Sequence, residues 1–255
     1  MFGYQRPSAT ALLTAGGLLV TAIGIWIQAL SGAPEYPTIP PGPIVLVLVA
    51  AATVLRAARW RWLPFAGALL SLLITVGVFV TPHTMNRLRA PEAVGVLAGT
   101  LIQLAGLAMA NVAGFLATMQ QYGTAMPRLV SRFVGVPFVL IGAIMFVRGA
   151  GDETMHNLLH FATGLAAAWV GFRMSDWAAS RFCIATGSLY LTLGLAGLIL
   201  GDPTMERMWT VGPLHLTTAD HLLHIVLGAV LMLSTGARVV AANATTLSVA
   251  SYSRK

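Results

Sequence analysis

The chain has 255 residues, of which 57% are hydrophobic and 9% are charged, and it carries a formal net charge of +7. Soluble domains have about a quarter charged residues, and a soluble fold of this composition would expose large apolar patches. The composition therefore excludes a soluble protein and predicts an all-α membrane protein. Because the basic residues lie in short loops between apolar segments, we interpret the positive charge as a topology signal and expect no nucleic-acid partner.

A membrane-spanning helix needs about 20 mostly apolar residues, and eight such segments follow one another along the chain. They are predicted at Ala9–Leu30, Pro43–Leu55, Leu63–Val80, Ala93–Met119, Phe133–Val147, Met155–Phe172, Phe182–Leu200 and Asp220–Val240. The second and the fifth are short by this standard. The first is longer than the apolar core of a cleaved signal peptide, which is about 7–15 residues, so we expect it to be retained as a helix.

The basic residues predict the orientation of these eight spans. The amino-terminus, the loops after even-numbered helices and the carboxyl-terminus hold 11 of the 15 basic residues: Arg6, Arg56, Arg59, Arg61, Arg128, Arg132, Arg173, Arg181, Arg238, Arg254 and Lys255. Cytoplasmic loops carry the excess of Lys and Arg. Both termini are therefore predicted in the cytoplasm.

A tandem duplication is visible in two segments that both follow an apolar helix. Thr81–Leu88 reads TPHTMNRL, and Gly201–Met208 reads GDPTMERM. Each has a proline, then Thr-Met, then an arginine two residues later. An even number of spans in each copy lets both copies keep the same orientation, which gives parallel repeats.

The duplication predicts two parallel four-helix units that meet near Ser131. The first unit is expected over residues 1–130 and the second over residues 131–240, with a cytoplasmic tail at residues 241–255. The tail is short and polar.

Two stretches of the second unit share the pattern LLHxxxG: MHNLLHFATG at Met155–Gly164 and ADHLLHIVLG at Ala219–Gly228. Their histidines are four and three residues apart, so each pair lies on one helix face near the outer end of its helix. The pairs are His156 with His160 and His221 with His224. Ionisable side chains inside a bilayer usually face the bundle interior. We therefore expect His160 and His224 to approach each other.

Three interpretations of these histidines remain open. In the first, each histidine only forms a hydrogen bond with a loop carbonyl or with an acid such as Asp152, Glu153 or Asp220. Gly164 and Gly228 then let neighbouring helices approach closely. In the second, His160 and His224 bind a haem iron from opposite sides, and the two glycines leave room for the macrocycle.

The third interpretation is a copper or zinc site, because neutral imidazole suits both metals. Its candidate ligands are His156, His160, His221 and His224. Thioether groups next to imidazoles favour copper, and four methionines are near in sequence: Met85, Met155, Met205 and Met208.

No catalytic set accompanies the histidines. The sequence lacks HExxH, GxSxG and P-loop motifs, so we expect a non-catalytic protein. The predicted midplane of the spans holds no Asp, Glu, Lys or Arg, which is unlike an ion-coupled transporter. The expected partners are the lipid bilayer and either another membrane protein or a second copy of the chain. A structural or assembly subunit, or a small-molecule or lipid transporter, are the alternative functions.

The segment from about residue 133 to residue 240 resembles an uncharacterised family of bacterial four-helix membrane proteins, a domain of unknown function. The matching positions are Asn157, His160, Gly164, Asp220, Leu223, His224 and Gly228. His221 stands where the family usually has asparagine. The resemblance implies a four-helix unit in a bacterial plasma (inner) membrane and these site residues, but it implies no activity.

Overall fold

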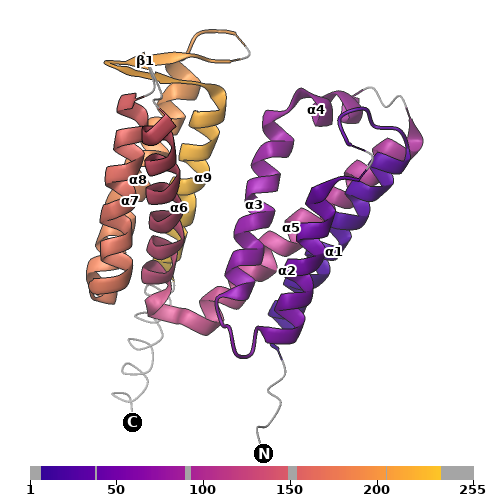
Figure 1. The fold of residues 1–255 in the computed structure, drawn as a ribbon, viewed down its shortest axis with the longest axis horizontal. Helices are drawn as coiled ribbons and strands as arrows, with labels where there is room; N and C mark the ends of the chain where they lie inside the picture. Colours follow the sequence, from indigo (N-terminus) through magenta and orange to yellow (C-terminus); the bar gives the residue numbers. More distant parts are fainter. Residues whose placement is uncertain (1–6, 38, 90–92, 149–153, 205, 237–255) are drawn as a thin grey trace, which may run out of the picture. The chain divides into compact units, whose positions relative to one another are not determined.

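The computed structural model describes residues 7–37, 39–89, 93–148, 154–204 and 206–236, and almost all of them are helical (Figure 1). The chain divides into two compact units, Met1–Gln121 and Tyr122–Lys255. The boundary precedes the one predicted near Ser131 because the first helix of the second unit already begins at Met126. The predicted tail, residues 241–255, lies outside the described residues.

The first unit is built from five helices among its described residues: α1 (Ala9–Leu30), α2 (Pro41–Arg56), α3 (Leu63–Val80), α4 (Pro82–Arg89) and α5 (Val94–Tyr122). The Ser8 side chain accepts a hydrogen bond from the Ala11 amide and so caps α1. A proline in the first turn starts α2 and α3 without losing a hydrogen bond. The buried side chains are mainly small, so the helices can pack closely.

Helices α1 and α5 touch through glycines spaced seven residues apart. A Cβ added at Gly17 would lie 2.5 Å from the Ala110 amide nitrogen, and one added at Gly106 would lie 2.5 Å from the Thr21 amide nitrogen. Gly24 and Gly99 form the next contact of the same kind. Small residues at a membrane helix interface let the two backbones approach directly.

A buried amide links the same two helices. The Gln28 Nε2 group donates to Gln103 Oε1 at 2.7 Å, and the Gln28 Oε1 atom accepts from Thr100 Oγ1 at 3.2 Å and from Arg87. Arg87 also forms an ion pair with Glu35, so α4 is tied to the end of α1.

We expect Gln28→Leu to destabilise the first unit by about 1–3 kcal/mol, because it leaves Gln103 Oε1 buried without a donor. Gln28→Leu combined with Gln103→Leu should cost less than the sum of the two single changes. Thermal unfolding in detergent measures both effects. Additive losses would contradict the direct amide contact.

The second unit contains a 3₁₀ turn, η1 (Gly123–Ala125), and then α6 (Met126–Arg148), α7 (Thr154–Arg173), α8 (Asp176–Leu200), β1 (Trp209–Val211), β2 (Leu214–Leu216) and α9 (Thr218–Ser234). Helices α6 and α7 pack side by side, as do α8 and α9. Thr217 and Asp220 form a capping box that starts α9 immediately after the hairpin.

The sequence predictions located the long helices but missed two local elements. Ala9–Leu30 and Leu63–Val80 coincide with α1 and α3. The two segments that suggested the duplication fold differently: Thr81–Leu88 contains most of α4, whereas Gly201–Met208 is a loop that leads into the β1–β2 hairpin. Gly212, with φ of +58°, makes the tight turn of this hairpin.

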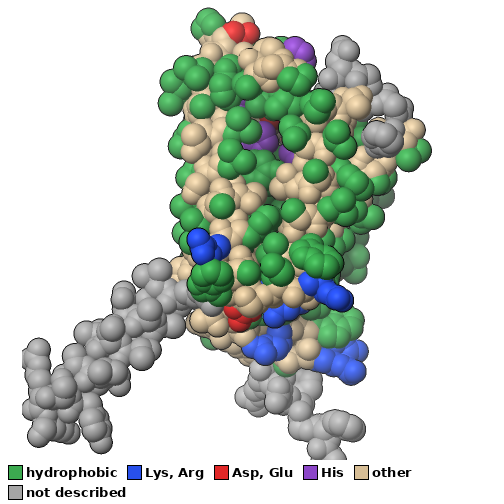
Figure 2. Space-filling model, turned by 90° about the vertical axis from the view of Figure 1, so that its left-hand side faces the viewer, with side chains coloured by type: hydrophobic (Ala, Val, Ile, Leu, Met, Phe, Trp, Pro, Cys, Tyr) green, Lys and Arg blue, Asp and Glu red, His purple; other side chains and the backbone are tan. Residues whose placement is uncertain are grey.

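Three helical stretches of the described residues are long and apolar enough to cross a membrane: Ala9–Leu30, Val94–Met145 and Asp176–Leu200. α1, with 22 residues, is about 33 Å long, which matches the hydrocarbon thickness of about 30 Å. Many large apolar side chains point outward from these helices. Figure 2 shows hydrophobic side chains over the middle of one face, as expected for a surface in contact with lipid.

Candidate metal centre

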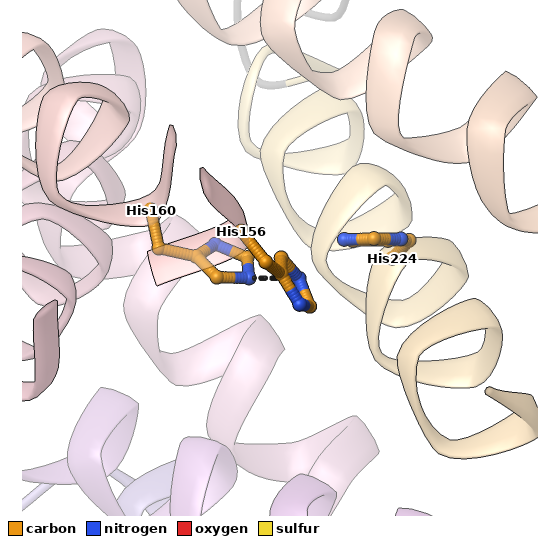
Figure 3. A group of neighbouring side chains, drawn as sticks. All are labelled: His156, His160 and His224. Carbon is orange, nitrogen blue, oxygen red and sulfur yellow. Dashed lines mark hydrogen bonds between the residues drawn. The ribbon is translucent and has the colours of Figure 1, made fainter. Parts of the chain in front are cut away.

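Helices α7 and α9 bring three histidines together in the second unit (Figure 3). His156 and His160 lie on one face of the first two turns of α7, and His224 lies on α9. One ring nitrogen from each lies within 4.8 Å of the other two. His156 Nε2 and His160 Nε2 are 2.8 Å apart, so the N–H of one donates to the lone pair of the other.

Aromatic rings form the walls around this group. The edge of Phe138 meets the His160 ring with centroids 4.8 Å apart, and the Tyr190 ring stacks on His224 at 5.1 Å. His224 is 2% exposed, whereas His156 and His160 are half-buried. Figure 2 shows histidine side chains between hydrophobic ones on one face of the molecule.

The hydrogen-bonding interpretation leaves this group incompletely explained. The Nδ1 atoms of His160 and His224 are buried and have no hydrogen-bond partner among the described residues. A buried polar atom without a partner costs about 1–3 kcal/mol. Each of these Nδ1 atoms is therefore an unused N–H or an unused lone pair, depending on the tautomer, and the buried Nδ1 of His221 is in the same state.

The group fits a small transition-metal ion. Zinc binds histidine nitrogen at about 2.0–2.1 Å, so tetrahedral ligand atoms are about 3.4 Å apart. In the structure the three ligand atoms lie within 4.8 Å of one another, so the rings would move closer together to reach that separation. Because His156 and His160 share a hydrogen bond, an ion bound by both rings would displace its proton, and metal binding releases such protons.

His221, the fourth predicted ligand, does not belong to this group. Its Nε2 donates to the Arg207 backbone oxygen at 2.9 Å, and its ring packs where a Cβ on Gly197 would stand. It is fully buried and Trp209 covers it. One turn of α9 separates His221 from His224, so the two rings reach different neighbours. His221 thus anchors the loop that precedes the hairpin, as the hydrogen-bonding interpretation expects.

Asp202 orders the other end of this loop. Its side chain accepts hydrogen bonds from the Thr204 hydroxyl and from the Thr204 and Met208 amides. The Thr204 hydroxyl is the main cause that holds the pKa of Asp202 below its ordinary value. The ionised carboxylate is the acceptor, so its contribution is complete above the ordinary pKa of about 3.9 and disappears as the pH falls through the lower folded value.

We expect His221→Ala to loosen residues 201–217 without removing a metal ligand. The Arg207 oxygen loses its donor, and a cavity opens beside Gly197. Hydrogen–deuterium exchange of this segment should become faster while the metal content stays unchanged. If the variant loses its metal while the hydrogen–deuterium exchange of this segment stays unchanged, His221 is a metal ligand.

The residues that were predicted to surround haem do not fit it. A Cβ on Gly164 would lie 2.7 Å from the Val139 amide nitrogen, and one on Gly228 would lie 2.6 Å from the Gly187 oxygen. Helices α6 and α8 therefore fill the space beside both glycines, as in the close-packing interpretation. His160 Nε2 faces His156, not an open slot.

A separate crevice of about 310 Å³ between α6 and α7 has no histidine in its lining, which consists of Gly142, Ala143, Val147, Asn157, Leu158 and Phe161. It therefore offers no axial ligand for a haem iron.

Only two of the four methionines that favoured copper have described side chains. Met155 and Met208 are exposed, and the side chains of Met85 and Met205 lie outside the described residues. Sequence reasoning missed Phe138 and Tyr190 as walls of the site. Tyr190 carried a signal, since it is a polar aromatic residue in the middle of an apolar span.

Residues 152–237 match the family model described as Domain of unknown function (DUF4383). This segment is similar to that family. The resemblance predicted for residues 133–240 is thus confirmed over the part that carries α7, α8 and α9, including all three clustered histidines. No curated protein and no solved structure matches the chain. The DUF4383 description carries no activity, so the function has to be argued from the site.

Proposed function

We propose that the chain is an integral protein of the bacterial plasma membrane that holds one zinc or copper ion near the outer side of its second unit. The ligands are His156, His160 and His224. Eight spans with both termini in the cytoplasm are supported by the helix bounds and by the Arg and Lys distribution. In this topology the first turns of α7 and α9 lie at the outer membrane face.

One observation carries the metal assignment: three imidazoles from two helices present nitrogens to a single position. Two rings with complete hydrogen bonding would fit a structural role. The buried Nδ1 atoms of His160 and His224 lack a partner, as that of His221 also does, so the convergence of three rings on one position is what favours an ion. A neutral imidazole is a good ligand for zinc, copper, iron and nickel.

The ligand set also indicates what the ion does. No carboxylate or thiolate belongs to the group of ligands among the described residues, so three neutral donors leave the ion with its full charge. Three protein ligands keep a fourth position open for water or for an exchanging ligand. Such a site suits reversible binding or transfer of the ion at the outer face, a metal-handling role.

Purification in mild detergent followed by elemental analysis tests the proposal. We expect about one zinc or copper ion per chain, and no Soret band. Replacement of the ion by Co²⁺ should give the visible absorption of a nitrogen-ligated tetrahedral ion. Protein that stays metal-free after incubation with each metal would contradict the proposal and favour the structural or assembly subunit.

A further inference from the structure

The end of the second unit away from the histidines gathers arginines. α7 rises by about 20 Å between His160 and Arg173. The beginnings of α6 and α8 meet the end of α7 there, and their arginines are Arg128, Arg132, Arg173 and Arg181. Asp176 is the acid at this end, and it pairs with Arg128 at 3.6 Å. The local charge is strongly positive.

Three of these arginines lie over aromatic rings. Arg181 lies 4.7 Å from the Trp177 ring centre, and Arg173 lies 5.7 Å from that of Trp169. Both tryptophans are more than half exposed. Arg132 makes a similar contact with Phe172. A cation over a ring face is held in place by the ring, and exposed tryptophan marks the membrane interface.

The four arginines differ in whether their N–H donors already have a partner in the protein. Arg132 Nε donates to the Gly171 oxygen at 2.8 Å, and Arg128 faces Asp176. Arg173 and Arg181 form no hydrogen bond or ion pair with any described residue. Their guanidinium groups are exposed and oriented by the rings, so their N–H donors are available to an anion.

We propose that this arginine–aromatic rim, Arg132, Arg173 and Arg181 with their three rings, binds the headgroup phosphate of acidic phospholipids in the cytoplasmic leaflet. The inference rests on the membrane placement proposed above, but not on the metal. Basic groups at the cytoplasmic end of spans attract anionic lipid, at about 1 kcal/mol for each Lys or Arg. The apolar surface next to the rim would accommodate the acyl chains of a lipid (Figure 2). A free phosphate has no acyl chains and would gain nothing from this surface.

Native mass spectrometry of the detergent-solubilised protein tests this binding with phosphatidylglycerol, phosphatidylcholine and inorganic phosphate. We expect phosphatidylglycerol to be retained at least about tenfold better than phosphatidylcholine. The Arg173→Gln, Arg181→Gln double variant should lose this preference. Equal retention of both lipids, or tight binding of inorganic phosphate alone, would overturn the proposal.

The Arg56→Gln, Arg59→Gln double variant is the matched control. It removes the same charge from exposed arginines that are predicted to face the same side of the membrane, and neither lies over an aromatic ring among the described residues. This variant should keep the lipid preference. If both variants lose the lipid preference equally, the preference depends on general charge, and the proposal that the arginine–aromatic rim binds the lipid is wrong. Metal content and membrane extraction, measured on the same samples, separate this failure from failure of the proposed function.

Discussion

The His224→Ala variant is expected to be purified without the metal ion proposed for this site. His224 is the only one of the three proposed ligands that comes from α9, so its loss leaves His156 and His160 on a single helix. The affinity should fall by more than the roughly 10–100-fold that changes outside the ligand shell cost. Elemental analysis of the purified variant, followed by titration with zinc, measures both the occupancy and the affinity.

His215→Ala is the matched control for this experiment. His215 lies on the exposed hairpin, where its ring contacts the Thr210 hydroxyl at 3.2 Å, and it is outside the ligand group. This variant should retain the ion. If both variants retain it, the three-imidazole site is wrong, and if both lose it, the ion is bound through a general effect of the outer histidines.

Gly17→Ala is expected to destabilise the first unit by about 1–3 kcal/mol. The new Cβ would lie 2.5 Å from the Ala110 amide nitrogen and 2.8 Å from the Gly106 oxygen. Both atoms belong to the backbone of α5 and cannot rotate away, so α1 and α5 must separate along the seam. Thermal unfolding in detergent measures the loss.

The neighbouring position supplies the control. A Cβ on Gly16 meets only the end of the Met109 side chain at 3.7 Å, which is an ordinary contact. Gly16→Ala should therefore be neutral or stabilising by up to about 1 kcal/mol, because alanine favours the helix. Equal destabilisation by both variants would mean that helix propensity or detergent contacts dominate, not close packing of α1 on α5.

The helices could be predicted because each depends on a run of residues that are adjacent in sequence. An apolar run long enough to cross the bilayer must satisfy its backbone internally, so α1 and α3 begin and end where the apolar residues do. The elements that were missed depend on the contacts of a few side chains. Arg87 ties α4 to Glu35 and Gln28, and Asp202 Oδ1 accepts three hydrogen bonds in the loop before the hairpin.

The site was predictable in part for the same reason. Spacing alone puts His156 and His160 on one helix face, and the cost of an ionisable group in lipid points His160 and His224 inward. The spacing cannot distinguish the roles of His221 and His224, however, because both lie within one turn of α9. Only the neighbours of each ring, Arg207 beside His221 and Tyr190 beside His224, separate a loop anchor from a candidate ligand.

The sequence by itself determined that this is an all-α protein with spans long enough for a bilayer, and that two of these spans carry histidines near one end, because composition and periodicity are local properties. Only the tertiary structure decided which imidazoles share one position and what fills the space beside each glycine. Those outcomes depend on helix contacts between residues far apart in the chain, such as Gly164 with Val139 and His160 with His224, and no local pattern encodes the rotation of one helix against another.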